Sequence, residues 1–210
     1  MSIIIKFKDL LIETLKENKK LIIGVYLLFI ICFIAAWIMS GTAVESAISN
    51  STVSNATNSG MEFESAVGIL IQNEWGGIVT YAASIFFAIP AFIMIIYNGI
   101  NLGFMGQLFS QAIPNGGLKY IVYLIPHGIF EITATVLQSV AGILLFLFIW
   151  RFVKAWRSSQ TQGASDAFDK TKKVLIQSIV LMIFAAILLI IAAPIESYIS
   201  VPFSDIIVGP

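Results

Sequence analysis

The side chains best placed for acid–base chemistry in this 210-residue chain are His127 and Glu131, which lie four positions apart. His127 and Glu131 stand in a long apolar stretch, with Pro126 and Gly128 beside the histidine. If the segment is helical, positions i and i+4 share one face, so the imidazole could donate to the carboxylate or pass it a proton. One interpretation is a proton relay or ion-binding pair. The other, which we favour, is a hydrogen-bonded clamp at a helix break, because Pro126 lacks an N–H and Gly128 permits unusual backbone angles.

Composition places this pair in a membrane. Hydrophobic residues make up 58% of the chain and charged residues 11%, whereas a soluble domain has about one half and one quarter. A chain of this length cannot bury so many apolar side chains in a water-soluble globule. The composition therefore excludes a soluble enzyme, a disordered chain and a collagen-like chain. A charged group in hydrocarbon is costly unless it is paired or hydrated, so His127 and Glu131 need an explanation.

The inventory of reactive side chains argues against catalysis. The chain has one His and one Cys, Cys32, which lies in an apolar run and is interpreted as a small core or lipid-facing residue. A conventional zinc site is not expected, and no set of nucleophile, base and orienting group can be assembled. We therefore expect no enzymatic activity, no cofactor, no metal and no nucleic-acid partner.

Three uncharged runs are long enough to cross a bilayer as helices, which takes about twenty residues. They span residues 21–39, 76–97 and 174–195. Pro90 lies inside the second run and predicts a bend there. The first run is interpreted as a retained span rather than a cleaved signal peptide.

A fourth apolar stretch, residues 118–150, is too long for one straight crossing. We predict two helical pieces, 118–125 and 129–150, that meet at a break at the Pro-His-Gly motif. The Gly-rich residues 100–113 before it are interpreted as a short helix that dips into the membrane, and a turn follows at residues 114–117.

The predicted fold class is an all-α, polytopic integral membrane protein with about five membrane segments and a broken or re-entrant helix at the Pro-His-Gly motif. In chain order, the predicted parts are an N-terminal amphipathic segment (1–20), the first span (21–39), a loop with an interfacial helix (40–75), the second span (76–98), broken or re-entrant segments (99–127), a further span (128–150), a basic loop (151–173), the last span (174–195) and a tail (196–210).

The distribution of Lys and Arg predicts the orientation, because basic residues gather in cytoplasmic loops. Residues 1–20 carry five Lys and residues 151–173 carry six basic residues, whereas residues 40–75 and 196–210 carry none. The protein is therefore expected in the cell membrane with a cytoplasmic N-terminus and an extracytoplasmic C-terminus. An even number of crossings must then separate the second span from the basic loop. An up-and-down pair and a re-entrant hairpin both satisfy this condition.

The predicted outer loop opens with a Ser-, Thr- and Asn-rich connector, residues 41–60, which holds glycosylation acceptor patterns at Asn50 and Asn55. Residues 61–75 follow as an interfacial helix. Glu74 falls on the apolar face of this helix. We interpret it as part of a helix end that emerges into water, or as a residue that pairs with a neighbouring protomer.

A patch of glycines and asparagines lies before the Pro-His-Gly motif; its members are Asn98, Gly99, Asn101, Gly103 and Gly106. The glycines are spaced by four and three residues, so they share one helix face and let a neighbouring helix approach closely. The asparagines could donate hydrogen bonds across such a contact. We favour tight packing over a substrate path. A small bundle with such a face is also expected to form a homodimer.

These residues resemble the stage II sporulation protein M family. The resemblance rests on Asn98-Gly99, on a Gly at 103 or 106, and on the block Leu-Ile-Pro-His-Gly-Ile-Phe-Glu-Ile-Thr-Ala that runs from 124 to 134, followed by a small Ala-Gly pair at 141–142. It covers residues 76–150 closely, and the first and last spans by layout. Thr133 stands where many members have Pro.

The resemblance implies a five-span bundle without enzymatic activity. In spore-forming bacteria the founding member works with two peptidoglycan-remodelling partners during engulfment and holds them at the membrane, although many members occur in organisms that never sporulate. We therefore expect a non-enzymatic membrane scaffold or assembly protein for a cell-envelope complex. The alternative is a small transporter or channel that uses His127 and Glu131 to bind protons or ions, because many transporters build ion sites at broken helices.

Overall fold

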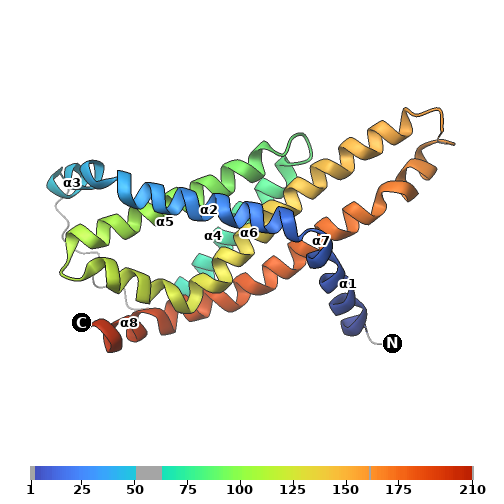
Figure 1. Ribbon diagram of the computed structural model, residues 1–210. Helices are drawn as coiled ribbons and strands as arrows, with labels where there is room; N and C mark the ends of the chain where they lie inside the picture. Colours follow the sequence, from blue (N-terminus) through green and yellow to red (C-terminus); the bar gives the residue numbers. More distant parts are fainter. Residues whose placement is uncertain (1–2, 51–62, 161, 210) are drawn as a thin grey trace.

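The computed structural model describes residues 3–50, 63–160 and 162–209, and within these ranges the chain is helical apart from short turns, with no strand (Figure 1). In chain order the elements are α1 (Ile3–Glu17), α2 (Lys19–Met39), α3 (Gly41–Asn50), α4 (Phe63–Ala83), α5 (Ile89–Ala112), α6 (Gly116–Trp156), α7 (Ala164–Ile195), the π-helical turn η1 (Glu196–Ser200) and α8 (Val201–Val208).

The all-α, polytopic membrane class is confirmed. Four helical segments among the described residues are long and apolar enough to cross a membrane: α2, α5, α6 and the continuous segment Ala164–Val208. Helix α4 has 21 residues, as many as α2, but its Asn, Gln and Glu side chains make it more polar. The structure thus has four clear spans where about five were expected, with α4 as a further long helix.

Helix α6 forms the centre of the bundle. Every residue from Ala134 to Leu145 is buried, because α6 packs extensively along α7 and also contacts α2, α4 and α5. Figure 1 shows α6 and α7 side by side, with their connected ends projecting beyond the rest of the bundle. The buried apolar side chains of this core include Leu137, Leu181 and Ile95.

The predicted helix break at the Pro-His-Gly motif is wrong. Helix α6 runs unbroken through Pro126 for 41 residues, and Gly128 does not adopt the positive φ that would mark a break. A proline removes only one backbone donor, and a transmembrane helix packed among neighbours tolerates that loss. The predicted hydrogen-bonded clamp therefore has no helix break to close. His127 and Glu131 do not replace backbone partners lost at a break.

The predicted re-entrant segment is also replaced by regular helix. Residues 99–112 are the second half of α5, and the chain reverses between Ala112 and Gly116. Asn115 adopts a left-handed conformation (φ 55°), and a Cβ on Gly116 would collide with the carbonyl of Phe109, so this turn needs a glycine. Helices α5 and α6 form an up-and-down pair, as the charge distribution allows.

The predicted second span, 76–98, is divided between two helices. Helix α4 joins the expected interfacial helix to the start of that span, and the chain leaves helical geometry before α5 begins at Ile89. Pro90 lies in the first turn of α5 rather than in the middle of a helix. This position suits proline, because the first N–H groups of a helix have no intrahelical acceptor.

Three predicted loops are largely helical. The basic loop 151–173 consists of the end of α6, a turn and the start of α7, and the outer connector begins as α3. Asn50 is the last residue of α3, and Asn55 lies outside the described residues. The tail continues as η1 and α8, and α8 is attached to α6 because Lys119 contacts the Asp205 carboxylate at 2.8 Å and donates to the Gly209 carbonyl at 3.0 Å.

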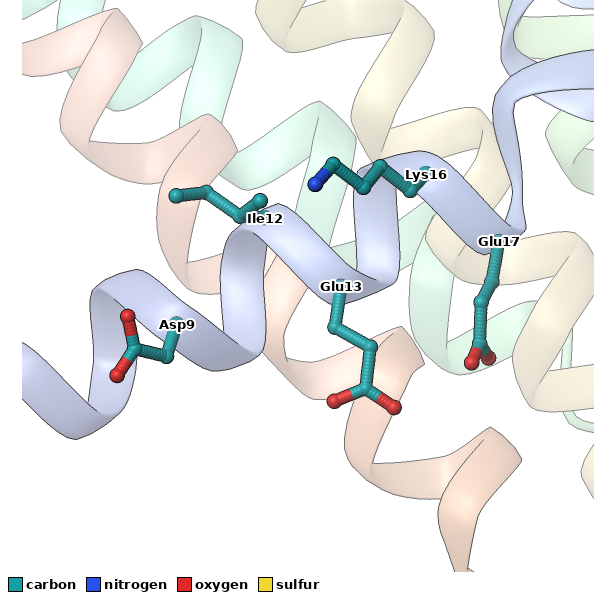
Figure 2. A pocket seen from close by; sticks show the side chains of 5 residues that line it. All are labelled: Asp9, Ile12, Glu13, Lys16 and Glu17. Atoms are coloured by element: carbon teal, nitrogen blue, oxygen red, sulfur yellow. The ribbon is translucent and has the colours of Figure 1, made fainter.

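Helix α1 lies against the beginning of α7. Figure 2 shows Glu13 and Glu17 projecting from α1 in the same direction. Lys173 of α7 contacts both carboxylates, at 2.9 Å and 2.6 Å, and Gln177 donates to Glu17 at 2.6 Å. These contacts hold the N-terminal helix at the same end of the bundle as the α6–α7 connection.

The contact between α1 and α7 is expected to depend on pH. The hydrogen bond from Lys173, and then that from Gln177, lower the pKa of Glu17 below its ordinary value of 4.5. A lowered folded-state pKa means that the contribution of Glu17 to stability is present above 4.5 and is lost as pH falls through the folded-state value. Thermal unfolding should therefore show wild type more stable than Glu17→Gln at neutral pH, with the difference vanishing in acid. A difference that persists or grows in acid would rule out this contact as its source.

Candidate functional site

A cluster of three ionisable side chains, the His–Glu–Glu cluster, lies inside the bundle. His127 and Glu131 come from α6, and Glu196 comes from η1. One nitrogen or oxygen from each of the three lies within 4.8 Å of the others. The His127 Nε2 and Glu131 Oε2 atoms are 3.9 Å apart, so the two residues share a face one turn apart, as their spacing predicted, but are too far apart to form a hydrogen bond.

Each member of the cluster is oriented by a different neighbour. Ser200 of η1 lies 2.8 Å from His127 Nδ1. Asn73 of α4 donates to Glu131 Oε1 at 2.8 Å, and Tyr123 of α6 donates to Glu196 Oε1 at 3.3 Å. These bonds connect α4, α6 and the C-terminal turn, so the cluster holds three parts of the bundle together.

The contacts of Ser200 are consistent with one tautomer of His127. The Ser200 hydroxyl can donate its one proton to the Ile195 carbonyl at 3.2 Å, and in that arrangement it accepts at 2.8 Å from Nδ1–H of the imidazole. In the neutral ring the proton is then on Nδ1, and the lone pair of Nε2 faces Glu131.

The π-helical geometry of η1 brings Glu196 and Ser200 to the cluster. The turn begins two residues after Pro194, and the Ser200 side chain bonds to a carbonyl five residues earlier, at Ile195. Short π-helical turns are rare and occur frequently at functional sites. Here the turn places a carboxylate and a hydroxyl against the same stretch of α6.

The cluster lies deep in the bundle. Glu131 is roughly 22 Å along the axis of α6 from Gly116, at 1.5 Å per residue. At nearly the same level, Tyr26 near the middle of α2 donates to Thr133 at 2.6 Å. The His127 side chain is 3% exposed and that of Glu131 is 24% exposed. Neither Glu131 nor Glu196 has a Lys or Arg nitrogen within 4.0 Å among the described residues.

The glycines of the Gly-Asn patch lie against α2. A Cβ on Gly99 would lie 2.9 Å from Cys32 Cβ and 2.9 Å from the Phe29 carbonyl oxygen of α2. A Cβ on Gly103 would collide with the Phe33 carbonyl. Gly106 lies under the Trp37 ring. These contacts support tight packing rather than a path for substrate.

The asparagines of that patch do not connect helices. The Asn98 side chain donates to the Met94 carbonyl of its own helix at 2.9 Å, and Asn101 is exposed. The predicted hydrogen bonds across the α2–α5 contact are therefore not formed by these two residues.

Two further polar groups sit elsewhere in the bundle. Tyr81 of α4 donates to Ser178 of α7 at 2.9 Å, and Ser178 in turn donates to the Ala141 carbonyl of α6 at 2.7 Å. Glu74 lies in the middle of α4, not at an emerging helix end, and its buried Oε1 has no hydrogen-bond partner among the described residues. Helix α4 thus makes polar contacts at two levels of the bundle, through Asn73 and through Tyr81.

A groove of about 570 Å³ runs between α2 and α6 beside the Pro-His-Gly motif. Apolar side chains such as Phe29, Ile34 and Ile125 line most of it, together with Gly128 and Thr133. Its apolar lining suits contact with lipid rather than passage of water or ions.

Sequence reasoning identified His127 and Glu131 but missed Glu196, Asn73, Tyr123 and Ser200. Glu196 follows the last uncharged run and was placed in the outer tail. The apolar residues after it, at helical spacing from Tyr198 to Ile207, would have indicated that the helix continues. The partners of Glu131 and Glu196 carried no comparable signal.

The long apolar helices and the polar cluster buried among them define a polytopic α-helical membrane protein. The chain belongs to the stage II sporulation protein M family, whose profile matches residues 25–201. That range includes all six residues of the cluster and its hydrogen-bonding shell. The resemblance seen in the Pro-His-Gly block is thereby confirmed.

One relative is an uncharacterized protein of Methanocaldococcus jannaschii, MJ0793, which is 34% identical over 125 residues. The match covers 57% of this chain and 61% of that relative. No solved structure matches the chain significantly.

Proposed function

We propose that this protein is a non-enzymatic membrane scaffold or assembly protein for a cell-envelope complex. The observation that supports it is the role of the polar side chains around the cluster: the hydrogen bonds of Ser200, Asn73 and Tyr123 join α4, α6 and η1. Such bonds favour one fixed arrangement of helices, which a scaffold needs to hold partners in register. Membership of the stage II sporulation protein M family is consistent with this role.

The proposal includes an orientation and an oligomeric state. The contact of α1 with Lys173 puts both Lys-rich segments at one end of the bundle, which supports a cytoplasmic N-terminus by the positive-inside rule. The bundle also exposes large apolar side chains on several helices, which supports a homodimer as well as contact with lipid. Cross-linking in native membranes that yields only monomer would contradict the dimer.

Affinity capture from native membranes tests the scaffold. The tagged chain, cross-linked before solubilisation, should enrich the same envelope-remodelling membrane proteins in every replicate, relative to an unrelated tagged membrane protein of similar abundance. Deleting the gene should then disperse those partners from their site in the envelope. Absence of any reproducible partner, or unchanged localisation after deletion, would contradict the proposal.

The second candidate function is a small transporter or channel for protons or ions. The observation that favours it is the position of His127, Glu131 and Glu196 within 4.8 Å of one another deep among the helices, since intramembrane ionisable groups often mark ion pathways. The unbroken α6 removes the helix break on which this idea was first based. Flux through reconstituted protein decides between the two functions.

A further inference from the structure

We propose that His127, Glu131 and Glu196 together bind a divalent transition-metal ion, such as Zn²⁺, inside the bundle. This site is additional to the scaffold function and does not depend on it. A single histidine excludes a His-rich zinc site, but an imidazole with two carboxylates is a sufficient set of three protein ligands, with a further position for water.

The three ligand atoms are close to the spacing that such an ion requires. Nitrogen and carboxylate ligands lie about 2.0–2.2 Å from Zn²⁺, so ligands in a tetrahedral site are roughly 3.4 Å apart. The His127 Nε2 and Glu131 Oε2 atoms are 3.9 Å apart, and all three residues offer atoms within 4.8 Å of one another. Side-chain movements of about an ångström or less would complete the coordination.

The hydrogen bonds around the cluster orient each ligand as metal sites commonly do. A metal-binding histidine almost always donates its other ring N–H to a neighbour, and ligating carboxylates are themselves hydrogen-bonded. Here Ser200 Oγ lies 2.8 Å from His127 Nδ1, and Nε2 lies 3.9 Å from Glu131 Oε2, so a ring proton on Nδ1 leaves the Nε2 lone pair directed toward Glu131. Asn73 and Tyr123 each occupy one oxygen of Glu131 and Glu196, and the second oxygen of each carboxylate remains for an ion.

The charge of the two carboxylates gives independent support for a bound cation. Two carboxylates lie together at depth, and among the described residues neither has a Lys or Arg nitrogen within 4.0 Å. Two negative charges at this depth are costly without compensation. One divalent cation would neutralise both carboxylates while the imidazole stays neutral.

The chemistry of the donors favours a transition metal over Mg²⁺ or Ca²⁺. Calcium takes six to eight oxygen ligands and magnesium keeps several waters, whereas imidazole nitrogen suits Zn²⁺, Fe²⁺, Cu²⁺ and Ni²⁺. The competing occupant is a pair of protons, one on each carboxyl group. Two protons are compatible with the same geometry but give the cluster no affinity for metal, and the experiment separates protonation from metal binding.

The test uses the full chain, purified in lipid nanodiscs and stripped with a chelator. Zn²⁺ is titrated by calorimetry, and bound metal is counted by mass spectrometry after gel filtration. We expect one ion per chain in wild type, and at least tenfold weaker binding in Glu131→Gln and Glu196→Gln. Glu45→Gln, which removes an exposed carboxylate on α3, should bind as wild type does.

A milder variant protects the test against misfolding. Tyr123→Phe removes only the hydroxyl that donates to Glu196, and should weaken Zn²⁺ binding about tenfold while the protein stays folded. Wild type that binds no stoichiometric Zn²⁺ would overturn the proposal and favour the protonated pair. Equal affinity in wild type and Glu196→Gln would overturn it as well.

Discussion

Replacing His127 by Ala should lower the free energy of unfolding by about 2–4 kcal/mol. The His127 side chain is 3% exposed, so its removal leaves a cavity in the bundle. It also leaves the Ser200 hydroxyl without its donor at the point where η1 contacts α6. Reversible unfolding in lipid–detergent micelles, followed by circular dichroism, measures the loss. Hydrogen exchange should accelerate most in residues 195–208, because the substitution detaches this part of the chain first.

A conservative variant separates the hydrogen bond from the lost volume. In His127→Asn, the side-chain amide can replace the Nδ1–H donor to Ser200 while most of the cavity remains. We expect it to recover about 1 kcal/mol relative to His127→Ala and to slow exchange in residues 195–208. If both variants unfold as wild type does, His127 does not hold the C-terminal turn against α6.

The second large effect is expected at the contact between α2 and α5. Gly103→Ala should destabilise the protein by about 1–3 kcal/mol, because its Cβ would collide with the Phe33 carbonyl and lie only 2.9 Å from Ala36 Cβ. A backbone carbonyl cannot rotate away as a flexible side chain can, so the two helices must separate. The midpoint of thermal unfolding measures the change.

Helix α2 offers a matched control for this substitution. Gly24 is exposed, and a Cβ added there meets nothing within 4 Å. Gly24→Ala should therefore be neutral, or more stable by up to about 1 kcal/mol through its higher helix propensity. If the two substitutions have the same effect, then helix propensity, rather than close approach of α2 and α5, determines the role of Gly103.

Much of the fold follows from patterns in the sequence. Uncharged runs of sufficient length predicted α2 and the C-terminal part of α7, and the spacing of Gly99, Gly103 and Gly106 predicted a close helix contact. The i, i+4 spacing of His127 and Glu131 predicted a shared face. These features depend on local periodicity and composition, which the chain shows directly.

The errors arose where tertiary packing overrides a local signal. Pro126 predicted a break, but α6 is enclosed by other helices along the buried stretch that follows, and it continues through the proline. Pro90 predicted a bend, although proline also suits the first turn of a helix, which is where α5 begins. In both cases a proline has more than one permitted position, and sequence alone does not choose between them.

Half of the candidate site depends on contacts between distant segments. Glu196 and Ser200 reach His127 only because η1 continues α7 alongside α6, which a hydropathy pattern does not predict. Asn73 comes from a helix that was expected at the membrane surface, and its bond to Glu131 joins residues 58 positions apart. Such contacts require the arrangement of α4, α6 and η1 in space.

Flux through reconstituted protein tests most directly whether the cluster holds the bundle together or moves ions. Wild type and Glu131→Gln are reconstituted into liposomes that contain indicators for protons and for Zn²⁺, and a gradient of each ion is applied. We predict that both proteins leave the flux at the level of protein-free liposomes, because the cluster is a fixed connection between α4, α6 and η1. Rapid uptake by wild type that Glu131→Gln abolishes would contradict the scaffold and establish a transport pathway through the cluster.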